Sequence, residues 1–201
     1  VELGHGIISS CEHGFQGNYW ETYSLAEKYN LKFIFGAEAY WVKNKGGELA
    51  NDELKQDNTN NHICIFANND SGRKAINLLL SDANEFGFYY KPRASVDDIL
   101  SLPKDDVFIT SACVGFWGYG YEYSEEFIKK LSDRFGDNFM LEVQYHNTDK
   151  QKQLNKNILE LSKKYNIKRI MGCDSHFIKD EQKYDRDYIL EYKGVKYPDE
   201  V

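Results

Sequence analysis

The sequence predicts an α/β fold in which short β segments alternate with amphipathic helices. Two observations support this fold class. Six runs rich in β-branched and aromatic residues recur along the 201-residue chain, and the stretches between them carry apolar residues at helical spacing. The length fits one domain, so we expect a single domain over 1–201. Alternation of this kind favours a mainly parallel sheet, arranged either as a barrel or as an open sheet.

Each element has its own local signal. The β segments are expected at 6–11, 33–42, 62–67, 107–113, 138–146 and 169–176, and the helices at 18–29, 71–84, 95–102, 124–135, 149–165 and 180–192. Capping-box spacing supports two helix starts, at Asn18 with Glu21 and at Ser95 with Asp98. The polar, glycine-containing stretch 43–60 is expected as an exposed loop, 87–94 as an aromatic and basic loop, and 180–201 as the start of a connection to a further domain.

Composition narrows the functional classes. The chain has 32 acidic and 25 basic residues, whereas proteins that hold nucleic acid by charge alone are usually basic. Contact with a phosphodiester would therefore need local Lys or Arg residues or bound metal ions. No apolar stretch approaches the ~18–20 residues of a membrane span, and the first residues lack the pattern of a signal peptide, so we expect no membrane partner.

Two further sequence features concern the compartment and the extent of the chain. The four cysteines show no CxxC spacing, which is typical of a reduced, cytoplasmic protein. The chain opens with Val1 rather than Met, at what looks like the lead-in to a strand. We therefore expect it to be a piece of a longer protein.

Metal-capable side chains gather at the ends of the expected β segments. These candidates are His13, Glu38, Cys113, His146, Asp174 and His176, and His62 is the exception because it opens its segment. The carboxyl ends of parallel strands form one face, where active sites concentrate. A mixture of imidazole, carboxylate and thiolate ligands suits Zn²⁺, Mn²⁺ or Fe.

Each candidate taken alone also has an ordinary structural explanation. Cys113 fits a small buried thiol, and His62 with Cys64 fits a core pair on one strand face. Asp174-x-His176 places both side chains on one face, as a chelating pair needs, but surface pairs share this spacing. Glu38 lies within an apolar segment, where burying a carboxylate is costly unless it is paired or metal-bound. The conjunction of these residues, rather than any one of them, indicates a metal site.

The same segments resemble the PHP (polymerase and histidinol phosphatase) domain of bacterial C-family DNA polymerases, the DNA polymerase III alpha subunits. Cys11-Glu12-His13-Gly14 is similar to the family's T-D-H-G, and FGAEAYW is similar to I-G-C-E-x-Y. The run 87–93, GFYYKPR, matches a family motif almost letter for letter. Further similar motifs follow in order at 62–67, 111–113, 135–146 and 173–177. The resemblance covers about 10–190.

The resemblance implies a distorted (β/α)₇ TIM-like barrel with up to three divalent metals (Zn, Mn or Fe, with Mg as an alternative) in its mouth. The implied metal ligands are His13, Glu38, His62, Cys113, Asp174 and His176. The family takes three further ligands from an H-x-H and an Asp on the first strand and the loop after it, and this chain contains no H-x-H. We therefore expect a barrel lacking its first strand, or a degenerate site. Glu12, which stands where the family usually has Asp, is expected beside the ligands, as is His146.

The implied chemistry is metal-assisted phosphoester hydrolysis, with Asp174, His176 and Glu38 as catalytic residues. Some family members act in this way as 3′→5′ exonucleases on DNA ends, with the remainder of the polymerase alpha subunit as partner. Lys91 and Arg93 are candidates for phosphate contacts, although a structural turn with solvated charges explains them equally well. Two alternatives stay open: a catalytically dead structural module, and a stand-alone phosphatase acting on a small phosphomonoester. The GFYYKPR run counts against the latter.

Overall fold

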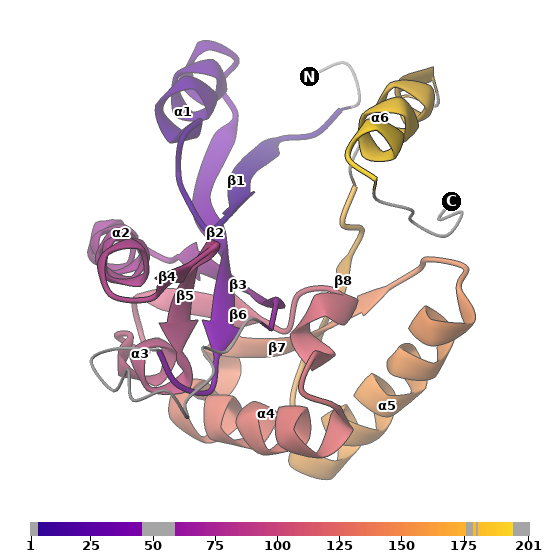
Figure 1. Cartoon of the computed structure of the whole chain (residues 1–201). Helices are drawn as coiled ribbons and strands as arrows, with labels where there is room; N and C mark the ends of the chain where they lie inside the picture. Colours follow the sequence, from indigo (N-terminus) through magenta and orange to yellow (C-terminus); the bar gives the residue numbers. More distant parts are fainter. Residues whose placement is uncertain (1–3, 46–58, 176–178, 180, 195–201) are drawn as a thin grey trace.

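The computed structural model describes residues 4–45, 59–175, 179 and 181–194, which form a curled, eight-stranded sheet with helices on its outer side (Figure 1). The strands are β1 (Ile7–His13), β2 (Lys32–Val42), β3 (Asn61–Ala67), β4 (Phe88–Tyr89), β5 (Lys91–Ser95), β6 (Val107–Thr110), β7 (Phe139–Gln144) and β8 (Arg169–Gly172). The α-helices are α1 (Tyr19–Lys28), α2 (Asp70–Glu85), α3 (Val96–Ser101), α4 (Tyr121–Phe135), α5 (Asp149–Tyr165) and α6 (Glu181–Tyr192). Two short 3₁₀ helices, η1 (Val114–Trp117) and η2 (Gly136–Asn138), flank α4.

Strand β2 is the centre of the arrangement. One edge of β2 pairs first with β1 and then with β5, and its other edge pairs with β3. The sheet continues through β6, β7 and β8. Within the described residues, β1 pairs with β2 alone and β8 pairs with β7 alone, so the sheet is a half-barrel. This shape agrees with the expected distorted barrel that lacks a strand.

The direction of β3 departs from the expected parallel sheet. Strand β3 runs antiparallel to both β2 and β6, whereas β1, β2, β5, β6, β7 and β8 form parallel pairs. Parallel neighbours need a crossover connection, usually a helix, and the sequence between β2 and β3 has no helical periodicity. The alternation of side chains along β3 is the same for either strand direction, so the pattern could not indicate this reversal.

The 87–94 stretch, expected as a loop, instead forms the β4–β5 hairpin, and β5 adds to the end of β2. Tyr90 turns the chain with φ +59°. Arg93 holds this turn, because its side chain is 4% exposed and donates hydrogen bonds to the backbone carbonyls of Tyr89, Lys91 and Thr59. A two-residue strand is too short to show an alternating pattern in sequence.

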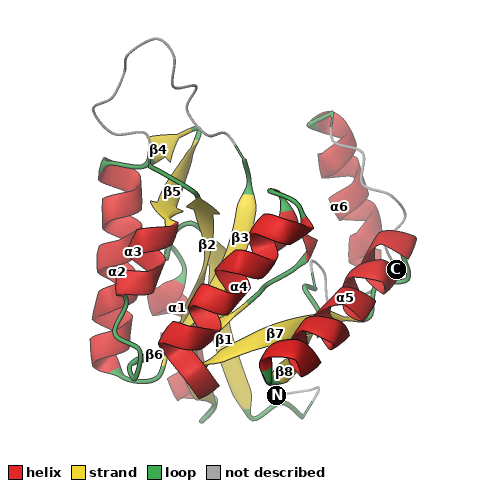
Figure 2. Ribbon diagram, turned by 90° about the horizontal axis from the view of Figure 1, so that it is seen from below, coloured by secondary structure: helices red, strands yellow, loops and turns green. Residues whose placement is uncertain are grey.

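The apolar core lies between the sheet and the helices on its outer side (Figure 2). Trp41 of β2 is fully buried, with its ring against those of Phe116, Phe127, Tyr119 and Tyr123. Aromatic side chains bury more apolar area per residue than other side chains do, so this cluster contributes strongly to the core. The outer face of β2 therefore anchors the half-barrel to η1 and α4.

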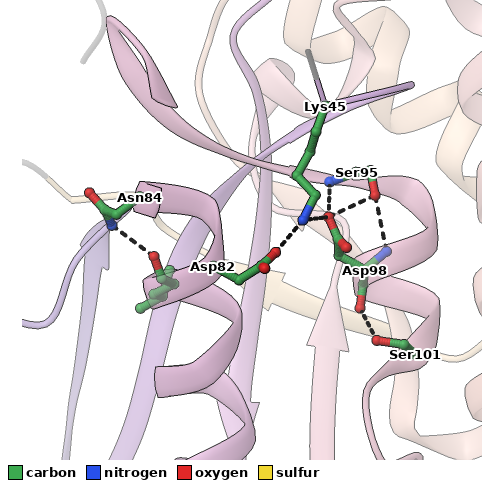
Figure 3. A network of polar contacts seen from close by, with 7 residues as sticks. Lys45, Asp82, Asn84, Ser95, Asp98 and Ser101 are labelled. Atoms are coloured by element: carbon green, nitrogen blue, oxygen red, sulfur yellow. Dashed lines mark hydrogen bonds and ion pairs between the residues drawn. The ribbon is translucent and has the colours of Figure 1, made fainter. Parts of the chain in front are cut away.

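Polar contacts fix the end of β2 to two helices (Figure 3). The Lys45 ammonium pairs with Asp82 of α2 and, at 3.0 Å, with Asp98 of α3. Burial lowers the pKa of Lys45, but its bonds to Asp82 and Asp98 outweigh this and raise it. The capping box predicted at Ser95 and Asp98 is confirmed, since the Ser95 hydroxyl accepts from the Asp98 backbone N–H and the Asp98 carboxylate accepts from the Ser95 backbone N–H.

Candidate metal centre

Three neighbouring strands bring His13, Glu38 and His62 together on the inner face of the half-barrel. His13, the last residue of β1, is in register with Glu38 of β2, and Tyr40 of β2 is in register with His62 of β3. Because β3 is reversed, its first residues lie beside the carboxyl end of β2. The sequence position of His62, at the start rather than the end of its strand, is thereby explained.

The Glu38 carboxylate lies between the two imidazoles. His13 Nε2 is 2.9 Å from Glu38 Oε2, and His62 Nδ1 is 2.8 Å from Glu38 Oε1. Glu38 is 6% exposed, and one ligand atom from each of the three residues lies within 4.8 Å of the other two. A buried carboxylate shared by two nitrogen ligands is a donor set that Zn²⁺, Mn²⁺ and Fe accept.

The charges at this cluster depend on one another. Burial raises the pKa of Glu38, but the hydrogen bonds from His13 and His62 outweigh burial and lower it to about 2. The hydrogen bond that His13 donates to Glu38 also raises the pKa of His13, against the effect of burial. Glu38 is therefore an anion at neutral pH. The same negative charge that favours a proton on His13 would stabilise a divalent cation at this place.

Cys113 and Asp174 lie at the edge of this cluster. Cys113 Sγ is 3.5 Å from His62 Nδ1 and accepts a hydrogen bond from the Gly115 backbone N–H at 3.3 Å. Burial raises the pKa of the Cys113 thiol to about 12, so it is neutral without a cation. Asp174 is exposed, and its negative charge adds to the raised pKa of both His13 and Cys113, behind the Glu38 hydrogen bond for His13 and burial for Cys113. His176 lies outside the described residues.

Gly115 is required by the close packing of this cluster. A Cβ atom there would lie 2.9 Å from His62 Cγ and Nδ1 and 3.3 Å from Cys113 Sγ. His62 Nε2 is buried and makes no hydrogen bond to the part of the chain that the structure describes. The other ring nitrogen, Nδ1, is the one that lies beside the Glu38 carboxylate and the Cys113 thiol. An imidazole with one buried nitrogen left without a partner fits a metal-binding role, because buried polar atoms otherwise find partners.

Two residues expected beside the ligands have other contacts. The Glu12 carboxylate accepts hydrogen bonds from the Asn18 backbone N–H at 3.1 Å and the Asn18 amide at 2.6 Å, so it caps the start of α1. The Asn18–Glu21 capping box predicted there is wrong, because the Asn18 side chain makes no capping bond. His146 lies beyond the end of β7, stacks on Tyr145, and has a buried Nδ1 without a hydrogen-bond partner among the described residues.

Lys91 lies at the rim of the cluster. It is held there by Tyr40, which was not among the site residues predicted from the sequence. The Lys91 ammonium sits 4.4 Å from the centroid of the Tyr40 ring and donates to Tyr40 Oη at 3.3 Å. Burial and the nearby Arg93 charge lower the pKa of Lys91, while the Glu38 charge raises it. The Arg93 guanidinium, by contrast, donates hydrogen bonds to backbone carbonyls. These bonds favour a structural role for Arg93 in the turn over a role in phosphate binding. Two-residue alternation from Glu38 was the signal that could have revealed Tyr40 on the same face.

Comparisons with known proteins identify the family of this chain. The PHP domain family matches residues 1–146, so the chain belongs to the PHP domain family. DNA polymerase III subunit alpha of Aquifex aeolicus is 29% identical over 192 residues, covering 91% of this chain and 16% of that protein. The corresponding subunit of Borreliella burgdorferi is 29% identical over 189 residues, with the same coverage. The chain thus spans about one sixth of the length of these relatives.

A solved structure assigned to a metal-dependent phosphoesterase of Bifidobacterium adolescentis superimposes with a TM-score of 0.49 at 11% identity, covering 92% of this chain and 86% of that one. In the part of the chain that the structure describes, no helix combines the length and apolar character needed to cross a membrane.

Proposed function

We propose that this chain is the PHP domain of a DNA polymerase III alpha subunit and that it hydrolyses phosphodiesters at DNA 3′ ends with bound divalent metals. The observation that carries the proposal is the buried Glu38 carboxylate between His13 and His62, at the strand ends of a PHP-family half-barrel. The kinship with DNA polymerase III alpha subunits supports the remainder of that subunit as its partner and the cytoplasm as its compartment.

In this proposal His13, Glu38, His62 and Cys113, with Asp174 and His176, hold the metals, which supply a Lewis acid that activates water and neutralises charge on the phosphate. Glu38 stays anionic through its two imidazole contacts, and so provides a fixed negative charge for a cation. We further propose that the exposed Asp174 carboxylate accepts a proton during the reaction. The Lys91 ammonium holds a phosphate oxygen at the rim.

The first test counts Zn, Mn and Fe in the chain purified without chelator, and then measures release of mononucleotides from the 3′ end of single-stranded DNA. We expect bound metal and a nuclease activity that chelation removes. Glu38→Gln should lose both, whereas Glu126→Gln, which alters only the exposed pair of Glu126 with Lys130, should keep both. Preferential turnover of a small phosphomonoester would instead favour a phosphatase.

A structural module is the second candidate, and a specific observation favours it. Among the described residues, the group of side chains that could hold a metal ion has three members, His13, Glu38 and His62, which is fewer than the six ligands of the catalytic proposal. Folded chain that binds no metal would establish this alternative and contradict the catalytic proposal.

A further inference from the structure

The Lys91 side chain is held in one place by Tyr40. The Lys91 ammonium contacts the Tyr40 ring face and also donates to its hydroxyl, at the distances given above. A lysine side chain otherwise samples many rotamers, and a contact of both kinds removes much of that freedom. The Tyr40 side chain is itself fixed, because Tyr40 is 6% exposed on the buried strand β2.

The backbone of Lys91 is held as firmly as its side chain. The Arg93 guanidinium donates to the Lys91 carbonyl at 3.1 Å and also to the Tyr89 carbonyl, across the turn at Tyr90. Pro92 packs where Gly14, the residue after His13, leaves room: a Cβ on Gly14 would lie 2.9 Å from Pro92 Cγ. The hairpin that carries Lys91 thus packs directly against the start of the loop that follows His13.

Tyr40 also contacts both imidazoles of the metal-binding cluster. Its ring stacks on His13, with centroids 6.2 Å apart and planes at 27°, and meets the His62 ring edge-on at 5.3 Å. One side chain therefore contacts two ligand residues and the cation at the rim. The distance between the ammonium and the cluster is set by the Tyr40 ring rather than by solvent-exposed rotamers.

We propose that Tyr40 is a positioning residue that fixes the Lys91 ammonium beside the metal-binding cluster, so that the two together bind the phosphate group of the substrate. This inference rests on the proposed function, because it assumes that the cluster binds metal and that phosphate is the ligand. It adds Tyr40 as the residue that links the metal-binding cluster to the Lys91 ammonium, the cation that contacts the phosphate. The shared chemistry is a phosphate oxyanion, whether it belongs to a DNA end or to a small monoester.

The chain contains a matched control pair on the other side of β2. The Lys43 ammonium lies 4.5 Å from the centroid of the Tyr119 ring and 4.0 Å from that of Tyr123, and Tyr119 packs on Trp41 in the outer core. The distance from the ammonium to the ring is nearly the same in the Lys43–Tyr119 and Lys91–Tyr40 pairs, and Tyr119 packs in the outer core instead of against the cluster. Lys43→Met and Tyr119→Phe therefore test what loss of such a pair does on its own.

The test is a double-mutant cycle on the affinity of the metal-loaded chain for inorganic phosphate. We expect Lys91→Met to weaken phosphate binding at least about 10-fold and Tyr40→Phe, which keeps the ring, about 3- to 10-fold. The double variant should be scarcely weaker than Lys91→Met alone, because Tyr40 acts through Lys91. Metal content should stay unchanged in Tyr40→Phe, and the Lys43→Met and Tyr119→Phe controls should bind phosphate like the unaltered chain.

Two other outcomes would overturn the inference, and comparison with nuclease activity separates the inference from the catalytic proposal. Additive effects of Tyr40→Phe and Lys91→Met would mean that Tyr40 does not act through Lys91. A loss of metal in Tyr40→Phe that accounts for its weaker phosphate binding would reduce Tyr40 to a support of the cluster. Coupling observed in a chain without nuclease activity would leave the inference standing while contradicting the catalytic proposal, whereas nuclease activity without coupling would do the reverse.

Discussion

The two faces of strand β2 are buried to the same extent for opposite physical reasons. On the outer face, Ala37, Ala39 and Trp41 join the apolar core, and their burial stabilises the fold. On the inner face, Glu38 and Tyr40 are each 6% exposed, yet burying the Glu38 charge opposes folding and is offset only by its two imidazole partners. Burial alone therefore does not identify the functional face; the chemistry of what is buried does.

The largest expected effect on stability comes from disrupting the packing on the outer face of β2. Trp41→Ala removes the ring that four other aromatic rings surround, and should lower the free energy of unfolding by about 3–5 kcal/mol. Urea unfolding measures this, with Trp20→Ala as control, because Trp20 is 70% exposed and its removal should change little. Equal effects of the two substitutions would contradict the placement of Trp41 in the core.

Glu38→Gln tests the inner face by itself. Gln keeps the shape and can still hydrogen-bond the imidazoles, so the metal-free chain should lose no more than about 2 kcal/mol of unfolding free energy. Metal affinity should fall at least about 100-fold, because removing a ligand costs more than removing a partner of a ligand. Titration of metal into folded variant and parent checks this. Full metal binding by Glu38→Gln would remove Glu38 from the site.

The pH dependence of the metal-free chain should differ between the faces. The pKa of Glu38 is lowered from 4.5 to about 2, so its contribution to stability is present above 4.5 and lost as pH falls towards 2. The pKa of His13 is raised above 6.5, so its contribution is present below 6.5 and lost as pH rises through the raised value. The contribution of the cluster should thus be greatest between 4.5 and 6.5.

Thermal unfolding across this range, with chelator present, measures the effect. Glu38→Gln should flatten both slopes, since the Glu38 hydrogen bond is the main cause of the raised pKa of His13. A variant with the same pH profile as the parent would show that the imidazoles do not depend on this carboxylate.

A smaller effect is expected where the inner face is only crowded. Gly115→Ala places a methyl group 2.9 Å from the His62 ring and should weaken metal binding about 10-fold while leaving the chain folded. Gly6→Ala is the control, because a Cβ there meets nothing within 4 Å. If both variants bound metal equally, the position of His62 would not depend on its packing against Gly115.

The smallest expected effect separates Glu12 from the cluster altogether. Glu12→Gln weakens a charge-assisted cap of α1 and should cost about 0.5–1 kcal/mol of unfolding free energy, with unchanged metal affinity. Denaturant unfolding and metal titration of the same sample check both statements. A loss of metal affinity would return Glu12 to the neighbourhood of the ligands.

Local patterns in the sequence predicted much of the fold. The helix expected at 149–165 is α5, Asp149–Tyr165, and the strand expected at 33–42 is β2, Lys32–Val42. In both, hydrophobic periodicity runs long enough to define the element. The direction of β3 and the β4–β5 hairpin could not be predicted in this way, because both depend on which strands become neighbours in space.

The residue types of the site could be predicted from the sequence, but the directions of their side chains could not. His13, Glu38 and His62 were expected and are brought together, whereas Cys113 and Asp174 are not part of the group of described side chains that could hold one metal ion. The sequence could not reveal that Glu12 turns towards Asn18 or that Arg93 turns towards backbone carbonyls, because a side chain's direction follows from partners distant in the chain. Tyr40 was missed because an aromatic residue in a buried strand is ordinarily assigned to the core.

The position of His13 at the last residue of β1 has a consequence for the motions of the sheet edge. Strand β1 pairs with β2 alone among the described strands, so its amide groups lie where fraying and register slippage begin. A one-residue slip would turn His13 to the opposite face of the sheet, away from Glu38 and His62. An ion that binds all three residues would therefore stabilise the observed register of β1. Amide hydrogen exchange along this edge should slow when the cluster binds metal.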